Sequence, residues 1–356
     1  MIFRTLKGLV FLALCAAVFA RAQATPREAL LALSKQAHTL AIVDPATLQV
    51  VARVPVGEDP HEVVASADGR TAYVSNYGFG RFHTLAVIDL VGQKARAPIE
   101  LGALRGPHGL AFAQGKLWFT AEAAKAIGSY DPAAGAVDWI MGTGQNRTHM
   151  LYVFAEGKRI VTTNVSSGTV TILEKTEGQT GMPAGPPPGM GTAMTPPPGM
   201  PPGLPGGDWT ETVIPVGARD EGFDVTPHGT EAWIANAGDG TISVIDLGAK
   251  KVVATLQADV RNANRLKFTP DGKLVLVSLL NGPDLVVLDA ATRTVVKRLP
   301  IGHGAEGVLM EPDGKRAFVA CSPDNSVAVI DLSTLQVVGR IDVGGNPDGL
   351  AWAVQR

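Results

Sequence analysis

Seven polar residues with metal-binding or acid–base side chains stand at matching positions along the chain. Each follows a short polar loop and lies near the beginning of an apolar run. They are His61, His108, His149, Glu221, Asn264, Glu306 and Asp348. Imidazole nitrogens bind divalent transition metals, so His61, His108 and His149 are predicted metal ligands. Histidine beside a carboxylate can also transfer protons, and His149, Glu221 and Glu306 are the catalytic candidates if the protein is an enzyme.

Arginines gather in the same loops. The guanidinium group binds carboxylates and phosphates through paired hydrogen bonds. Together with polar neighbours, these arginines predict a site for a small anionic ligand. The predicted set is Arg105, Arg147, Arg219, Arg261, Asn264, Arg265, His303 and Asp348.

A repeat positions these residues. An apolar run that ends in an acid occurs seven times, 42 to 45 residues apart except for one long interval. The acids are Asp44, Asp89, Asp131, Glu174, Asp246, Asp289 and Asp331. A second apolar run precedes most of them, after turn pairs such as Asp68-Gly69 that are typical of β-hairpins. Because a blade of four short strands has about this length, the predicted fold is all-β, a seven-bladed β-propeller with four-stranded blades.

The two ends of the chain complete one blade. Residues 30–56 match the last three strands of a blade, and residues 347–353 match only the first strand. We therefore expect a composite N/C-terminal closing blade, which leaves no free sheet edge. A single propeller domain is predicted over residues 25–356.

The strand order also sorts the loops between two faces. Loops that enter the innermost strand share a face with loops that join the second and third strands, because antiparallel strands alternate in direction. On this rule six of the seven histidines lie on one face, and only His228 lies on the other. We expect the seven polar residues to ring the mouth of the central channel on the histidine-rich face.

Several short motifs resemble those of a known family. The segment Tyr73-Val-Ser-Asn76 resembles the tetrapeptide that names the YVTN repeat, and Thr269-Pro-Asp-Gly-Lys273 and Val244-Ile-Asp-Leu247 resemble its other recurrent elements. The chain is thus similar to YncE-like periplasmic propellers and, more distantly, to the propellers of nitrous oxide reductase, cytochrome d1 proteins and bacterial lactonases. The resemblance implies the fold strongly and the function weakly.

The N-terminal segment indicates export. Arg4 and Lys7 precede an apolar run from Leu9 to Ala20, and small residues end at Ala24. This is the pattern of a cleaved signal peptide over residues 1–24, and it predicts a periplasmic or secreted protein without an integral membrane span.

Without the basic residues of that segment the chain has 28 basic and 33 acidic residues, a formal net charge of −5. That charge does not favour general nucleic-acid binding.

Residues 175–208 fill the long interval of the repeat. Proline, glycine and methionine dominate this segment, so a flexible insertion is predicted between the third and fourth strands of one blade, on the face opposite the histidines. Its methionines could suit soft-metal capture of Cu(I), but compositional drift is the favoured explanation.

Three classes of function follow. The first is a non-catalytic binding or scaffold protein of the cell envelope, whose polar channel mouth holds a small anionic ligand or another envelope protein. The second is a metal-dependent hydrolase or lyase of the lactonase kind, with a divalent transition metal as cofactor. The third, implied by the resemblance, is single-stranded DNA binding, for which Tyr77, Phe79 and Phe82 offer stacking surfaces.

Overall fold

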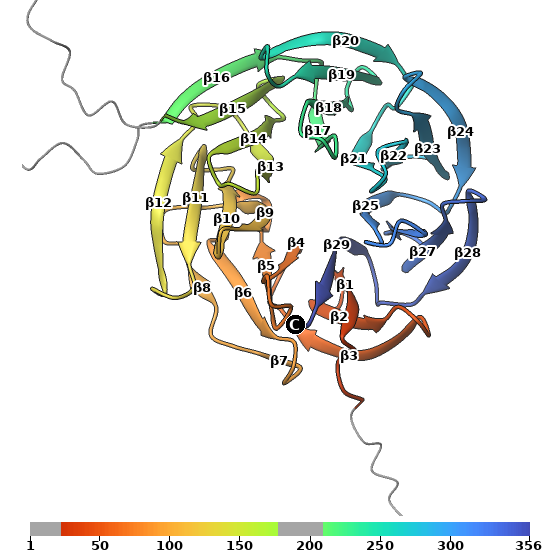
Figure 1. Cartoon of the computed structure of the whole chain (residues 1–356). Coiled ribbons are helices and arrows are strands. Elements are labelled where there is room, and N and C mark those ends of the chain that lie inside the picture. The colour runs from red at the N-terminus through yellow and green to blue at the C-terminus, as the bar shows by residue number, and fades with distance from the viewer. Residues whose placement is uncertain (1–22, 177–208) are drawn as a thin grey trace, which may run out of the picture.

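Seven antiparallel sheets surround a central channel in the computed structural model, which describes residues 23–176 and 209–356 (Figure 1). The predicted export signal, apart from Gln23 and Ala24, lies outside the described residues, and so does the predicted insertion from residue 177 to residue 208. The predicted seven-bladed all-β propeller is confirmed. We number the blades 1 to 7 and name the strands of each blade A to D from the channel outward.

The sheets follow the chain in order, apart from the closing blade. Blade 1 consists of β29 (Pro347–Val354), β1 (Glu28–Ser34), β2 (Thr39–Asp44) and β3 (Gln49–Pro55). Blade 2 consists of β4 (Pro60–Ala65), β5 (Thr71–Asn76), β6 (Thr84–Asp89), β7 (Lys94–Ala95) and β8 (Ile99–Glu100), with the short helix η1 (Gly78–Gly80) before β6. Blade 3 consists of β9 (Pro107–Ala113), β10 (Lys116–Ala121), β11 (Ala126–Asp131) and β12 (Ala136–Gly142). Blade 4 consists of β13 (Thr148–Val153), β14 (Arg159–Asn164), β15 (Thr169–Lys175) and β16 (Trp209–Pro215).

The remaining blades repeat the same plan. Blade 5 consists of β17 (Asp220–Val225), β18 (Glu231–Asn236), β19 (Thr241–Asp246) and β20 (Lys251–Gln257). Blade 6 consists of β21 (Ala263–Phe268), β22 (Leu274–Leu279), β23 (Asp284–Asp289) and β24 (Thr294–Pro300). Blade 7 consists of β25 (Ala305–Met310), β26 (Arg316–Cys321), β27 (Ser326–Asp331) and β28 (Gln336–Ile341).

The hydrophobic core is divided among the seven gaps between neighbouring blades. Strands B and C are buried almost throughout because both of their faces pack against another blade, as β5 and β27 show. Strand D alternates between half-buried and exposed residues, as in β12 and β20, because its outer edge faces solvent. One apolar cluster fills each gap; the cluster between blades 1 and 2, for example, joins Leu31 and Ile42 to Val74 and Ile88.

The closing blade forms as predicted. Strand β29 pairs with β1 in an antiparallel register that sets Leu30 opposite Trp352 and Ala32 opposite Leu350. The C-terminal strand therefore fills the innermost position of a blade whose other strands come from the N-terminus, beside β1 in Figure 1. The ring closes through main-chain hydrogen bonds as well as through side-chain packing.

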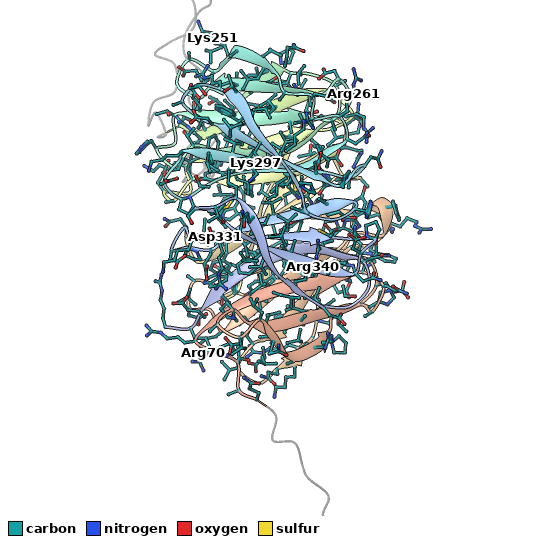
Figure 2. The ribbon with its side chains drawn as sticks, turned by 90° about the vertical axis from the view of Figure 1, so that its right-hand side faces the viewer. Arg70, Lys251, Arg261, Lys297, Asp331 and Arg340 are labelled. Atoms are coloured by element: carbon teal, nitrogen blue, oxygen red, sulfur yellow. The ribbon has the colours of Figure 1, made fainter. Side chains whose placement is uncertain are left out.

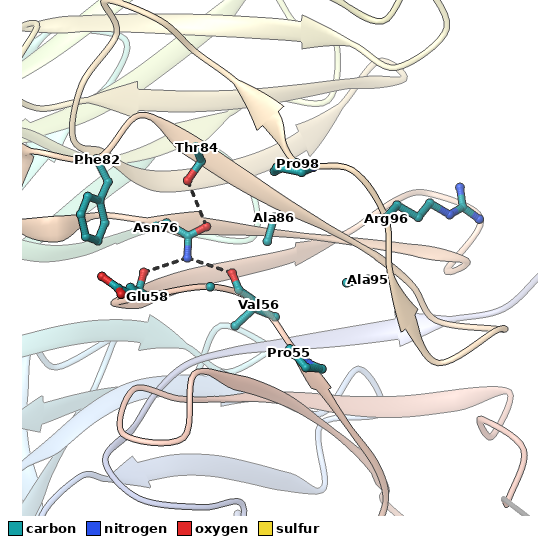
Figure 3. Close-up of a pocket in the computed structure, with 11 residues that line it drawn as sticks. Pro55, Val56, Glu58, Asn76, Phe82, Thr84, Ala86, Ala95, Arg96 and Pro98 are labelled. Atoms are coloured by element: carbon teal, nitrogen blue, oxygen red, sulfur yellow. Dashed lines mark hydrogen bonds between the residues drawn. The ribbon is translucent and has the colours of Figure 1, made fainter.

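Blade 2 departs from the repeat at its outer strand. Where other blades have one continuous strand D, β7 and β8 are separated by three residues that include Pro98, which has no amide hydrogen to donate to β6. The detour opens an apolar pocket of about 460 Å³ toward blade 1 (Figure 3). Asn76 lies in its wall, where its amide nitrogen donates to the carbonyls of Val56 (3.0 Å) and Glu58 (2.9 Å).

The two faces of the propeller carry the loops that the strand order predicts. In the edge-on view of Figure 2, Arg261, from the loop before β21, lies toward one face. Arg70, from the turn between β4 and β5, and Lys251, the first residue of β20, lie toward the opposite face. We call the face with the D-to-A and B-to-C loops the mouth face. His228 lies in the turn between β17 and β18, away from the mouth face.

Candidate functional site at the channel mouth

All seven polar residues predicted to ring the channel occupy the second position of an innermost strand. These strands are β4, β9, β13, β17, β21, β25 and β29, and the residues in the same order are His61, His108, His149, Glu221, Asn264, Glu306 and Asp348. We call this set the mouth ring. Its members share one level of the channel because each strand begins at the same level of its blade.

Backbone geometry places the mouth ring. At each ring residue, strand A has two residues opposite one residue of strand B, so the ladder contains a β-bulge in all seven blades. The residue before each innermost strand has a left-handed backbone. Its φ angle is 47° at Asp59, 69° at Gly106, 54° at Arg147, 55° at Arg219, 58° at Asn262, 57° at Gly304 and 51° at Asn346. A bulge in every blade belongs to the architecture, so the chemistry depends on which side chain each bulge presents.

Hydroxyl groups on strand B fix the bulges between neighbouring blades. The Thr120 hydroxyl accepts a hydrogen bond from the Gly109 amide (2.9 Å) and donates one to the carbonyl of His149 in the next blade (2.6 Å). Ser278 repeats the arrangement with the Arg265 amide and the Glu306 carbonyl. The backbone of one ring residue is therefore tied to the blade before it.

The polar atoms of three ring residues have partners, either in another ring residue or in Lys35. The His61 ring nitrogens lie 3.2 Å from an Asp59 oxygen and 3.3 Å from an Asp348 oxygen. The Lys35 ammonium joins Asp348 (2.6 Å) to Glu306 (3.1 Å). We call the ring residues His61, Glu306 and Asp348 the paired half of the mouth. Both ring nitrogens of His61 face carboxylates there.

The paired half has shifted pKa values. Burial alone would lower the pKa of His61, but its hydrogen bonds to Asp348 and Asp59 raise it to about 9. Burial would raise the pKa of Asp348, whereas Lys35 and His61 hold it well below its usual range. Burial, together with the Asp348 carboxylate, raises the pKa of Glu306 to about 8. Near neutral pH a proton is therefore retained on Glu306 while Asp348 is ionised.

The other four ring residues have polar atoms without partners. Among the described residues, no hydrogen-bond partner meets Nδ1 of His108, Nε2 of His149, Oε2 of Glu221 or Oδ1 of Asn264. All four residues are at least nine-tenths buried, with exposed fractions of 3, 2, 8 and 8%. Leaving a buried polar group unsatisfied costs about 1–3 kcal/mol, so four in consecutive blades mark a place where water, an ion or a ligand would bind favourably. We call these residues the open half.

A second set of polar side chains reaches the open half from the B-to-C loops. Glu122 follows β10 and accepts a hydrogen bond from Nδ1 of His149 and another from the Tyr77 hydroxyl. Burial would raise the pKa of Glu122, but these hydrogen bonds and Arg147 lower it, so Glu122 is a carboxylate. The sequence analysis did not select Glu122, because it followed only the innermost strands.

The two histidines of the open half lie close together. The imidazole centroids of His108 and His149 are 3.9 Å apart, and that of His61 is 5.2 Å from His108. Burial, and then the neighbouring His149, lower the pKa of His108 well below its usual value, so His108 is neutral at physiological pH. One donor atom from each of His108, Glu122 and His149 lies within 4.8 Å of the others, a set that can surround one metal ion.

The predicted metal and catalytic residues are thus divided. Of the three predicted metal ligands, His108 and His149 come together with Glu122, and His61 lies in the paired half. Of the three catalytic candidates, His149 and Glu221 are neighbours, with Nε2 of His149 3.7 Å from the Glu221 carboxylate. Glu306 is bound to Lys35 in the paired half.

The arginines predicted to bind an anion occupy two environments. Arg105, Arg147, Arg219 and Arg261 lie in the D-to-A loops of blades 3 to 6, which lead into the four strands of the open half. Arg147 reaches inward, to 3.5 Å from Glu122 and 3.9 Å from Glu221, and its side chain is 40% exposed. By contrast, Arg265 is buried in the channel against Glu62, away from the loops.

The remaining predicted ligand-binding and stacking residues differ in their surroundings. His303 is exposed and its ring nitrogen lies 3.2 Å from Asp324. Among the aromatic residues considered for base stacking, Tyr77 is buried against Glu122, whereas Phe79 is 78% exposed. Within the described residues no helix is long and apolar enough to span a membrane.

Comparisons with known proteins show the fold. No family model and no curated protein matches the sequence. Among solved structures, a protein of unknown function from Desulfotomaculum acetoxidans superposes with a TM-score of 0.70 at 13% identity, covering 92% of this chain and 99% of the other. A proposed 6-phosphogluconolactonase from Bacteroides uniformis gives a TM-score of 0.67 at 16% identity, covering 92% and 100%. Hydrazine synthase from Kuenenia stuttgartiensis gives a TM-score of 0.62 at 15% identity, covering 82% and 89%.

Proposed function

We propose that this protein is an exported, YncE-like propeller of the YVTN-repeat type that binds a small anionic ligand at the open half of its channel mouth. The observation that carries the proposal is the set of four buried polar atoms without partners in consecutive blades. The paired half of the same ring has no such group among His61, Glu306 and Asp348. Hydrogen-bond donors of a bound ligand would satisfy the Glu221 and Asn264 oxygens as the Lys35 ammonium satisfies Asp348 and Glu306, while its anionic group contacts the loop arginines.

The positive charge of the loops above the open half supports an anionic ligand. Arginines stand in the four loops above the open half, whereas the loops above the paired half have Asp59, Gly304 and Asn346 beside their strands. Arg147 and Arg219 also hold left-handed backbones, where the equivalent residues in other blades are aspartate, glycine or asparagine. Such a conformation costs roughly 1 kcal/mol for an arginine. Arg147 adopts it while its side chain reaches Glu122 and Glu221 at the open half.

The proposal is tested by titrating the metal-free protein with citrate and with inorganic phosphate in a calorimeter at low ionic strength. We expect binding to at least one probe, and we expect Arg147→Gln to weaken it at least tenfold, or by about 1.4 kcal/mol. Arg70→Gln is the matched control, because Arg70 is an exposed arginine on the opposite face. Absence of binding to both probes, or equal binding by Arg147→Gln and wild type, would count against an anion site at the mouth.

A metal-dependent hydrolase or lyase is the second candidate. The pairing of two imidazoles with the Glu122 carboxylate favours it, since catalytic zinc sites use two histidines and a glutamate and leave a position open for water. Hydrolysis of a chromogenic ester or a sugar lactone that requires added zinc, and that disappears in His149→Ala, would place this candidate first.

A further inference from the structure

We propose that His108, Glu122 and His149 bind one divalent transition metal ion, and that the anionic ligand completes its coordination. This inference rests on the proposed function, because the ligand in the mouth would occupy the remaining positions of the ion. His108 and His149 come from the innermost strands of blades 3 and 4, and Glu122 comes from the loop after β10. Three blade elements thus converge on one point at the channel mouth.

The distances fit a metal ion. The three donor atoms already lie within 4.8 Å of one another, and zinc bonds of about 2.0–2.2 Å to nitrogen and oxygen require side-chain shifts of about 1 Å. Among the described residues Nδ1 of His108 has no hydrogen-bond partner, which leaves that nitrogen for coordination. Nδ1 of His149 faces Glu122, so an ion between these two side chains would replace their hydrogen bond. Two nitrogens and one carboxylate form a donor set for zinc or a neighbouring transition metal, whereas calcium and magnesium prefer oxygen ligands.

The surroundings of the three ligands are organised as in metal sites. The Tyr77 hydroxyl donates a hydrogen bond to Glu122 and so fixes the orientation of that carboxylate. Such outer contacts orient the ligands and strengthen metal binding. Ring contacts of Tyr77 with His61 (4.9 Å) and His108 (5.1 Å) fix the phenol itself.

The neighbouring side chains lead from the ion toward solvent. Glu221 and Asn264, in the innermost strands of the next two blades, each have an unpartnered oxygen, and Glu221 lies 3.7 Å from His149 and 3.9 Å from Arg147. A ligand that combines an anionic group with hydroxyl donors would bind the ion, the two acceptors and Arg147 together. Hydroxycarboxylates such as citrate belong to this chemical class.

The test uses the full chain, prepared without a histidine tag, stripped with a chelator and then dialysed against zinc alone. We expect one zinc per chain by mass spectrometry in wild type and His303→Ala, and a loss of at least tenfold in zinc affinity in His108→Ala/His149→Ala. His303 is the matched control because it is an exposed histidine on the mouth face outside the cluster. Glu122→Gln keeps the shape of the side chain and should weaken zinc binding at least tenfold. This variant tests the proposal even if the double variant misfolds.

Two results would overturn the proposal: no zinc retained by wild type, or equal retention by wild type and Glu122→Gln with both proteins folded by circular dichroism. Citrate binding by the metal-free protein separates this failure from that of the proposed function. If citrate binds without zinc and added zinc leaves the citrate affinity unchanged, the result supports the anion site and rejects the proposal that citrate completes a metal site. If zinc binds and citrate does not, the metal site stands without the anionic ligand.

Discussion

At the scale of single residues, the mouth ring is divided by whether each polar atom has a partner. In the paired half, Lys35 neutralises Asp348, and Glu306 retains a proton near neutral pH because burial and the Asp348 charge raise its pKa to about 8. In the open half, the unpartnered atoms of His108, His149, Glu221 and Asn264 have no such compensation. The same bulge therefore presents structural residues in three blades and candidate binding residues in four.

The raised pKa of Glu306 predicts a pH dependence of stability. The folded protein holds a proton on Glu306 up to about pH 8, whereas an unfolded glutamate releases it near pH 4.5. This stabilising contribution is therefore complete below pH 4.5 and is lost as the pH rises to 8. Glu306→Gln keeps a neutral side chain, so its free energy of unfolding, relative to wild type, should increase by about 4 kcal/mol between pH 5 and pH 8.5.

Urea unfolding at the two pH values measures this difference, and Glu28→Gln, at an exposed position of β1, is the control. A Glu306→Gln variant whose difference from wild type is the same at both pH values would show that Glu306 titrates normally in the folded protein.

At the scale of strands and loops, the close approach of neighbouring innermost strands brings the two histidines together. A Cβ atom on Gly109 would lie 2.6 Å from the His149 carbonyl and 2.9 Å from the Met150 Cα, closer than non-bonded atoms approach. Only glycine at this position allows blades 3 and 4 to meet at the level of the ring. The 3.9 Å separation of the His108 and His149 rings depends on that contact.

Gly109→Ala should consequently lower the free energy of unfolding by about 1–3 kcal/mol and weaken ligand binding, because blades 3 and 4 must move apart. Gly142→Ala is the matched control: a Cβ atom there meets no atom within 4 Å, and its backbone does not require glycine. Denaturant unfolding and zinc titration of both variants provide the measurements. Similar values for the two variants would mean that the contact between these strands does not position the histidines.

Sequence comparison within the repeat explains why Glu122 was missed and how it could have been found. The residues that follow strand B in blades 1 to 7 are Lys35, Tyr77, Glu122, Val165, Ala237, Leu280 and Ser322. Three large polar residues in the first three blades depart from the smaller or apolar residues of the rest. They lie next to the three histidines of the ring, so a second ring traced through these loops would have placed Glu122 beside His149.

At the scale of the whole molecule, the repeat made the fold predictable. Seven copies of one apolar pattern, each too small to bury its own core, require neighbours on both sides, and the fragment at each end fits the same pattern. Which ring residues pair with one another was not predictable, because Lys35, His61 and Asp348 meet only after the ring closes. The break in the outer strand of blade 2 at Pro98 likewise depends on local pairing with β6.

Ring closure predicts a strong dependence of folding on the last strand. Deleting residues 347–356 removes β29, exposes the inner edge of β1 and takes Asp348 from the mouth. We expect this variant to lose cooperative thermal unfolding and to aggregate in size-exclusion chromatography, whereas deletion of residues 355–356 alone should lower the melting temperature by only a few degrees. A truncated chain that melts like wild type would contradict closure through β29.

The central claim, that the open half of the mouth is the binding site, is tested most directly by a crystal structure of the protein grown with zinc and citrate and measured at the zinc absorption edge. We expect one anomalous peak about 2.0–2.2 Å from donor atoms of His108, Glu122 and His149, with citrate between the ion and Arg147. A mouth that contains only water, with zinc and citrate bound elsewhere or absent, would contradict it.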